Sequence, residues 1–153
     1  MSARTPRPDK QEMVARARFR HQLRLFERFT EEACVEAGIT MPQYMLLLQV
    51  AGRPERDWAL IGELAECLVL RHHTAVELTS RCEVAGLVAR ERDEADQRKV
   101  RVRLTPAGRR IVERIARAHS QELQQLLDHM GQALARERPS LKVPAVRKGG
   151  SAA

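Results

Sequence analysis

The sequence predicts a mainly α-helical winged helix-turn-helix fold, with a small β-hairpin wing and long dimerisation helices at the N- and C-terminal ends. Apolar residues recur at helical spacing over most of the chain. Two short helical segments, 61–67 and 71–84, are separated by a tight connection. Two segments with strand character, 87–92 and 100–104, follow directly. A helix-turn-helix followed by a β-hairpin is the arrangement of a winged domain.

Length and composition narrow the class of protein. The 153 residues are enough for one domain with a real core and too few for two. No apolar run approaches the length of a membrane helix, and the charged N-terminus lacks the apolar stretch of a secretory signal. Cys34, Cys67 and Cys82 form no CxxC motif, which favours a reducing compartment over a disulfide framework. We therefore expect a cytoplasmic protein.

The positive charge of the chain lies at its two ends. The net charge is +7, from 27 Lys and Arg against 20 Asp and Glu. Residues 1–28 hold eight cations and three anions, and residues 136–153 hold five cations and one anion. Residues 29–135 hold 14 cations and 16 anions. A nucleic-acid partner therefore cannot be inferred from the total charge alone, although basic proteins often bind polyanions.

The first long helix is predicted over residues 10–37, after a disordered lead-in over residues 1–9 that contains two prolines. Gly38 is a natural stop for this helix. A helical pattern of mostly apolar residues runs along it in steps of four and three, a spacing typical of helices packed in pairs. These residues are Phe19, Leu23, Phe26, Thr30, Ala33 and Ala37.

The middle of the chain predicts short elements. Thr40 and Gln43 form a capping box that opens a helix through Val50. Residues 58–60 have the character of a very short strand, and Gly86 ends the 71–84 helix. In the segment 100–104, apolar residues alternate strictly with arginines, as in a strand with one buried face. The charged loop 93–99 is predicted to be the exposed tip of the hairpin.

The last helix is predicted to open at the N-cap Thr105 and to continue to about Glu137. Such a helix of roughly 32 residues would be about 48 Å long. A helix of this length cannot bury its apolar face against a small core, so a partner helix from a second copy is expected. We thus predict one domain over 10–137 and a basic flexible tail over 138–153. The winged helix-turn-helix at about 40–105 is predicted to be a DNA-binding core, because the second helix of such a motif fits the major groove.

Six fragments, in this order, resemble the MarR family of bacterial transcription regulators. They are Gly-Ile-Thr-Met-Pro-Gln-Tyr (38–44), Ile-Gly-Glu-Leu-Ala-Glu (61–66), Arg-His-His-Thr-Ala-Val-Glu-Leu (71–78), Ser-Arg-Cys-Glu-Val-Ala-Gly-Leu-Val (80–88), Arg-Glu-Arg-Asp-Glu-Ala-Asp-Gln-Arg (90–98) and Leu-Thr-Pro-Ala-Gly (104–108). The resemblance covers about residues 12–135. It implies a homodimer that binds palindromic duplex DNA, usually as a repressor, and that a small, frequently phenolic, ligand often releases.

The resemblance also implies site residues. The segment 71–85 corresponds to the recognition helix, whose groove-facing residues would be Arg71, His72, His73, Thr74, Glu77 and Arg81. Asp96-Gln-Arg98 matches the Asp-x-Arg of the family's wing, which makes Arg98 the expected minor-groove contact, assisted by Lys99. The expected ligand pocket lies between the dimer helices and the winged domain, near Phe26, Tyr44 and Trp58. No cofactor and no metal are expected.

The chain departs from the family pattern at several positions. Val69 stands where the family often has glycine, and Leu60 replaces a frequent threonine N-cap. Glu77 places an anion on the groove face, where it could accept from cytosine N4 or pair with Arg81. After residue 135 the usual final dimerisation helix is not recognisable.

Other functions are less well supported by the residues. The chain contains no HExxH, P-loop, GxGxxG or GxSxG motif, so an enzyme is not expected. One alternative is a winged-helix protein-interaction module without DNA binding, which Glu77 and the acidic middle of the chain suggest. A second is a thiol- or metal-sensing regulator on the same fold. Cys34 does not match the cysteine of the family's peroxide sensors, Cys82 is expected to pack in the core, and His119 is expected in a helix seam.

Overall fold

The computed structural model of the chain describes residues 7 and 9–136. The elements in order are α1 (Lys10–Glu36), α2 (Met41–Ala51), β1 (Trp58–Leu60), α3 (Ile61–Cys67), α4 (His72–Val84), β2 (Val88–Arg92), β3 (Val100–Leu104), α5 (Pro106–Ala118) and α6 (Ser120–Arg136). This confirms the predicted winged helix-turn-helix architecture. Apart from Arg7 and Asp9, the predicted lead-in and the predicted tail lie outside the described residues.

Local capping signals set the ends of the first two helices. Asp9 and Glu12 form a reciprocal capping box at the start of α1, with a backbone-to-side-chain bond of 2.8 Å from Glu12 N to Asp9 Oδ1. Gly38 follows α1 with a φ of +73°, and the next amide, Ile39 N, donates to Cys34 O at 3.0 Å. The predicted capping box of Thr40 opens α2.

The winged domain has one core between its helices and its sheet. The three strands form an antiparallel sheet in the order β1-β3-β2, with Ala59 opposite Val102 and Arg90 opposite Val102 on the other side. Val102 is fully buried, as the alternation in 100–104 predicts. The sheet and helices α2 to α5 enclose a cluster that includes Leu46, Leu47, Val50, Leu64 and Ile115.

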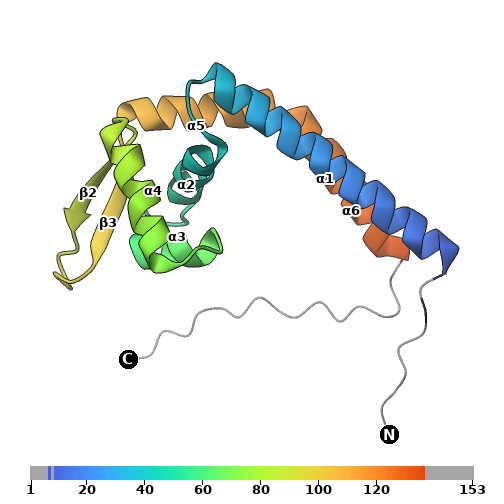
Figure 1. Ribbon diagram of the computed structural model, residues 1–153, viewed down its shortest axis with the longest axis horizontal. Helices are drawn as coiled ribbons and strands as arrows, with labels where there is room; N and C mark the ends of the chain where they lie inside the picture. The colour runs from blue at the N-terminus through green and yellow to red at the C-terminus, as the bar shows by residue number, and fades with distance from the viewer. Residues whose placement is uncertain (1–6, 8, 137–153) are drawn as a thin grey trace, which may run out of the picture.

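Helices α1 and α6 lie side by side and antiparallel, and they form an arm that projects from the winged domain (Figure 1). At 27 residues, α1 is about 40 Å long. Among the described residues, no helix is both long enough and apolar enough to cross a membrane.

The prediction of one continuous helix from Thr105 to about Glu137 is wrong, because the helix breaks at His119. His119 has φ −106° and ψ 12°, and it separates α5 from α6. Its side chain is buried, its Nε2 donates to Phe29 O at 2.9 Å, and its ring meets Phe26 edge-on. The contact with α1 thus ties the junction to a distant segment. No glycine or proline marks the break, so the sequence pattern did not show it.

The apolar side chains of α5 and α6 differ in burial. Val112, Ile115 and Leu126 are buried, whereas Ala116 is exposed. Leu123 and Leu127 are 44% and 50% exposed in the single chain. These two leucines therefore remain available to a partner.

Candidate nucleic-acid interface

The first helix of the helix-turn-helix, α3, begins without a side-chain acceptor at its N-cap. Leu60 occupies that position, as the departure from the family's threonine predicts. The carboxylate of Glu63 compensates, because its Oε2 accepts from the backbone N–H of Leu60 at 2.8 Å. The α3 helix is therefore stabilised at its start by a residue in its own first turn.

The turn between α3 and α4 contains a valine in the left-handed region. Val69 has a φ of +54° and is 90% exposed. The turn closes through Leu70 N, which donates to Ala65 O at 2.8 Å. Left-handed backbone is unfavourable for a β-branched residue and natural for glycine, which explains the frequent glycine at this position of the family pattern.

The second helix, α4, separates a packed face from an exposed face. Ala75, Leu78, Thr79 and Cys82 are buried against the core. The predicted contact residues Arg71, His72, His73, Glu77 and Arg81 are all exposed, and Thr74 is partly buried. Arg71 is the N-cap and gives no side-chain cap, so the first N–H groups of α4 are open to an anion.

Among the residues that the structure describes, Glu77 has no hydrogen-bond or ion-pair partner. The described contacts include no ion pair between Glu77 and Arg81, which rules out one of the two roles considered for Glu77 in this structure. The carboxylate is therefore open to a donor from outside the chain.

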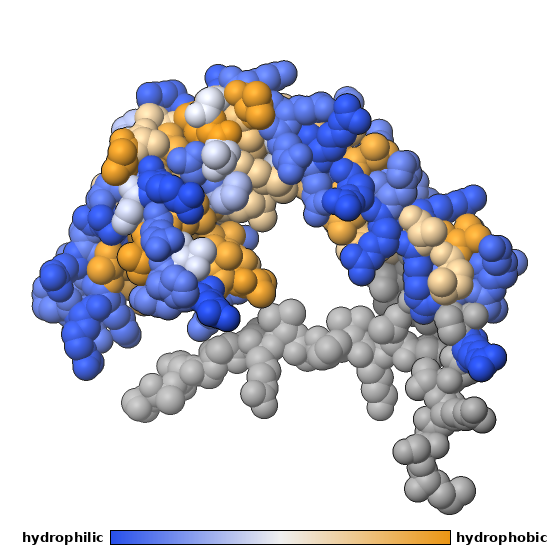
Figure 2. Space-filling view, in the orientation of Figure 1, coloured by the Kyte–Doolittle hydropathy of each residue, from blue (hydrophilic) through white to orange (hydrophobic). Residues whose placement is uncertain are grey.

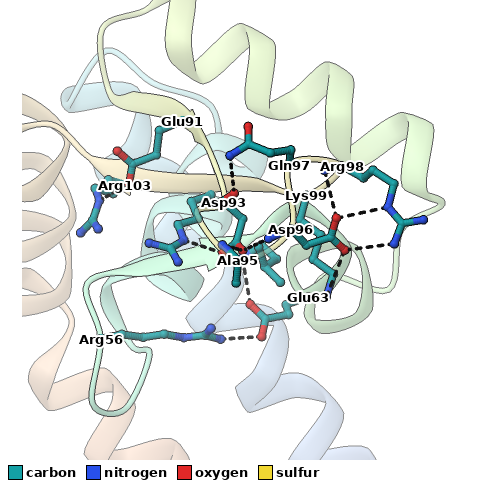
Figure 3. A network of polar contacts seen from close by, with 12 residues as sticks. Arg56, Glu63, Glu91, Asp93, Ala95, Asp96, Gln97, Arg98, Lys99 and Arg103 are labelled. Carbon is teal, nitrogen blue, oxygen red and sulfur yellow. Dashed lines mark hydrogen bonds and ion pairs between the residues drawn. The ribbon is translucent and has the colours of Figure 1, made fainter.

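The wing tip is organised by two aspartates (Figure 3). Asp93 is 6% exposed, and its Oδ1 accepts from the N–H groups of Ala95 and Asp96 at 2.9 and 2.8 Å. Asp96 Oδ1 accepts from the backbone N–H of Arg98 at 3.1 Å and from its Nε at 3.2 Å. Hydrogen bonds to charged donors hold the pKa of both carboxyls below the usual range, chiefly those from Arg101 and Arg98 respectively.

Arg98 extends from this tip, and its side chain is 92% exposed. Between the wing and the two helices lies a groove of about 460 Å³, whose lining includes His72, Arg98 and Lys99. The structure thus brings three of the predicted contact residues, from α4 and from the wing, to one groove. Glu63 and Glu66 of α3 line the same groove.

A contact that the sequence did not reveal ties the wing to α4. Arg90 of β2 donates from Nε to Glu83 Oε2 at 2.8 Å and from Nη1 to Ser80 Oγ at 3.2 Å. The hydrogen bond from Arg90 lowers the pKa of Glu83. Glu83 lies on a helix and Arg90 on a strand, so the periodicity within either element does not indicate the contact.

Comparisons with known proteins agree with this geometry. A family model described as "MarR family" matches residues 37–99. The transcriptional regulator HosA of Escherichia coli O157:H7 is 36% identical over 102 residues, which cover 65% of this chain and 73% of HosA. The chain belongs to the MarR family. Its HosA relative is a transcriptional regulator, and this chain is accordingly a MarR-family transcriptional regulator.

Solved structures show the same MarR-type fold. AbsC, a MarR family transcriptional regulator from Streptomyces coelicolor, superimposes with a TM-score of 0.69 at 24% identity, over 90% of this chain and 94% of AbsC. Reduced AbfR bound to DNA matches with a TM-score of 0.56 at 26% identity, over 84% of this chain and 98% of AbfR.

The three residues assigned to a MarR-type ligand pocket have different surroundings. Phe26 of α1 contacts His119, with 6.2 Å between ring centroids. Tyr44 is buried in the core of the winged domain, where burial raises the pKa of its hydroxyl. Trp58 of β1 packs against two arginine side chains. Their assignment to ligand binding stays a prediction.

The cysteines of this MarR-family chain differ in exposure. Cys34 and Cys82 are buried, and burial raises the pKa of both thiols, that of Cys82 to about 11. Cys67 is exposed, and Arg53 Nη2 lies 3.3 Å from its Sγ. In the described part of the chain, no group of three or more His, Cys, Asp or Glu side chains is placed to hold a metal ion.

Proposed function

We propose that the chain is a homodimeric repressor that binds palindromic operator DNA through α4 and the wing, and that a small, possibly phenolic, effector relieves the repression. The observation that carries this proposal is the exposed face of α4 beside the exposed Arg98. A helix of this kind fits the major groove of B-DNA, and an arginine on an adjacent wing fits the narrow minor groove.

The side chains of the proposed interface suit their partners. Arg71, Arg81 and Lys99 are exposed cations for phosphates, while His73 and Glu77 offer hydrogen-bonding groups to base edges. The wing, residues 88–104, holds six cations and four anions within a slightly acidic domain. The DNA-bound AbfR structure shares this architecture, which supports the same use of the fold here.

Dimerisation is supported by apolar side chains that the single chain leaves exposed. Met13, Val14, Phe29, Leu123 and Leu127 are between 38% and 51% exposed, and all lie on α1 and α6. Figure 2 shows apolar patches interrupting the polar surface of this arm. Burying them against a second copy would remove them from water, and the resulting two-fold symmetry matches a palindromic site.

The first test is selection of bound duplexes from a random pool with the full chain. We expect a palindromic consensus, because two α4 helices related by a two-fold axis would read inverted half-sites. Recovery of no preferred sequence, together with no salt-sensitive binding, would favour the protein-interaction module instead.

The second test changes the proposed contact residues on the selected duplex. His73→Ala and Glu77→Ala should alter base preference, since each removes a group facing the base edges. Arg98→Ala should weaken binding and make the dependence of affinity on salt shallower by about two counterions, one for each wing of the bound dimer. Arg114→Ala, an equal charge change on the exposed face of α5, is the control and should leave base preference unchanged. Unaltered preference in both α4 variants would refute the proposed recognition face.

A further inference from the structure

We propose that Trp58, held between Arg56 and Arg101, anchors the wing and positions Arg98 for DNA. We call Arg56, Trp58 and Arg101 the stack. Arg56 forms an ion pair with Glu63 at one end, and Arg101 forms an ion pair with Asp93 at the other. None of these five residues was among the predicted DNA contacts, and they are positioning residues. The inference rests on the proposed function, because Arg98 is taken as the DNA contact of the wing.

The centre of the stack is the chain's single tryptophan. The guanidinium carbons of Arg56 and Arg101 each lie 4.3 Å from the centroid of the Trp58 ring. This is well within the range of a cation–π interaction, which is strongest on tryptophan. The tryptophan is on β1 and Arg101 is on the neighbouring β3, so the stack joins two strands.

A continuous series of contacts leads from the stack to Arg98. Arg101 Nε donates to Asp93 Oδ2 at 2.6 Å, and both side chains are largely buried, at 15% and 8% exposure. The other oxygen of Asp93 accepts from the N–H groups of Ala95 and Asp96, which shapes the turn. Asp96 in turn binds Arg98. Displacing Arg101 would leave the buried carboxylate of Asp93 without its cation. Asp93 would then no longer be held in the position from which it accepts the hydrogen bonds that shape the turn.

The opposite end of the stack reaches the helix-turn-helix. Arg56 Nη2 lies 2.5 Å from Glu63 Oε1, and Glu63 Oε2 accepts from Leu60 N, the N-cap of α3. Although burial raises it, the pKa of Glu63 is lowered overall by its hydrogen bonds from Arg56 and Leu60. Figure 3 shows the Arg56–Glu63 pair beneath the wing turn. The stack therefore links the start of α3 to the wing tip.

Each cation of this assembly is paired with a carboxylate. Each of the two arginines on the ring has its own carboxylate, Glu63 or Asp93, so the repulsion between the cations is compensated at both ends. Arg103, on the same strand as Arg101, offers a contrast. It pairs with Glu91 and Asp57, and among the described residues neither carboxylate forms a hydrogen bond or an ion pair with the 93–99 turn. Residue 103 lies opposite Trp58 in the β1–β3 ladder, but Arg103→Ala removes none of the hydrogen bonds and ion pairs that lead from Arg101 to Arg98.

The first experiment measures amide hydrogen exchange at Ala95 and Asp96 in the full chain without DNA. Trp58→Leu should speed exchange at both amides about tenfold, the loss expected for a desolvated cation–π contact. Trp58→Phe keeps an aromatic face and should restore much of the protection, and Arg103→Ala should leave it unchanged. Equal protection in wild type and Trp58→Leu, or equal loss in Arg103→Ala, would overturn the inference.

The second experiment is a double-mutant cycle on the selected duplex. Trp58→Leu should weaken binding about tenfold in the wild-type background and cause no further loss in the Arg98→Ala background, because it acts through Arg98. The same loss in both backgrounds would mean a merely structural effect and would overturn the inference. If Arg98→Ala itself leaves affinity unchanged, the proposed DNA contact fails, and the exchange experiment alone decides whether the stack orders the turn.

Discussion

Val69 combines a left-handed backbone with a β-branched side chain. That side chain is 90% exposed, so it adds little packing with its neighbours. A φ of +54° costs a residue with a Cβ about 1–2 kcal/mol relative to the right-handed region. The turn nevertheless closes, because the hydrogen bond from Leu70 N to Ala65 O and the packing of α3 and α4 require this path. Here the tertiary fold imposes a backbone conformation that valine disfavours locally. The cost can be measured as a change in the free energy of unfolding.

Val69→Gly should stabilise the chain by about 1 kcal/mol, since glycine adopts positive φ without steric cost and the lost side chain is in solvent. Urea unfolding of the full chain measures the change. Val84→Gly is the matched control, because Val84 is also 90% exposed but ends α4 with helical geometry. Val84→Gly should lower stability. Stabilisation by both variants, or by neither, would contradict the strain at Val69.

The cysteines allow a prediction on reactivity. Thiolate is the reactive form, and the pKa of Cys82, about 11, keeps that thiol protonated at neutral pH, as the raised pKa of Cys34 does for the other buried thiol. Iodoacetamide should therefore modify Cys67 first, and should reach Cys34 and Cys82 only on unfolding.

Mass spectrometry of the alkylated protein at neutral pH measures this order, with urea-unfolded chain as the control. Early labelling of Cys34 or Cys82 would refute it and would reopen the thiol-sensing alternative at those positions. If DNA binding is insensitive to peroxide, to a chelator and to Cys67→Ser, that alternative is excluded altogether.

At the scale of elements, α5 is joined to the winged domain by a very close backbone approach. The N-cap Thr105 donates from Oγ1 to Gly86 O at 2.7 Å and accepts from Gly108 N at 3.1 Å. A Cβ on Gly108 would lie 2.0 Å from Leu87 O, which is backbone and has no flexible end to move. The start of α5 therefore depends on the absence of a side chain at residue 108.

Gly108→Ala should destabilise the chain by at least about 2 kcal/mol, because α5 must move away from β2 to admit the methyl group. Gly62→Ala in α3 is the matched control, since a Cβ there meets nothing within 4 Å. It should be neutral or slightly stabilising. Thermal and urea unfolding measure both, and equal stability of the two variants would contradict the proposed close approach.

At the scale of the whole molecule, the arm of α1 and α6 is a part whose apolar surface a single chain does not fully bury. Its two helices pack on each other and on α5 through His119, yet apolar side chains remain exposed along it. A second copy related by two-fold symmetry would cover them and would set the separation of the two α4 helices. The geometry of the proposed dimer would therefore determine the spacing of the two operator half-sites.

Leu127→Asp should convert the proposed dimer to monomers at micromolar concentration, because it places a charge where an apolar contact is expected. Sedimentation velocity measures the state. Val84→Asp, an equally drastic change outside the arm, should leave the dimer intact. A monomeric wild-type chain would contradict the proposed assembly itself.

Much of the fold was predictable because its signals are local. The capping box at Thr40, the N-cap Thr105, Gly38 and Gly86 at helix ends, and the alternation of 100–104 each act within a few residues. The exposed contact face of α4 followed from helical spacing and the family pattern. What could not be predicted depends on residues far apart in the chain. The break at His119 requires Phe29, and the anchoring of the wing requires Trp58 to meet Arg101.

The sequence alone determined the elements up to the start of α5, the helix-turn-helix with its wing and the family, because these follow from short-range periodicity, capping and motif order. Only the tertiary structure decided how α1 and α6 form an arm, and which arginines are held by carboxylates while Arg98 stays exposed. The physical reason is that a hydrogen bond or ion pair forms only between groups that are close in space. The amino-acid pattern does not directly encode the distance between residues that are far apart in the chain.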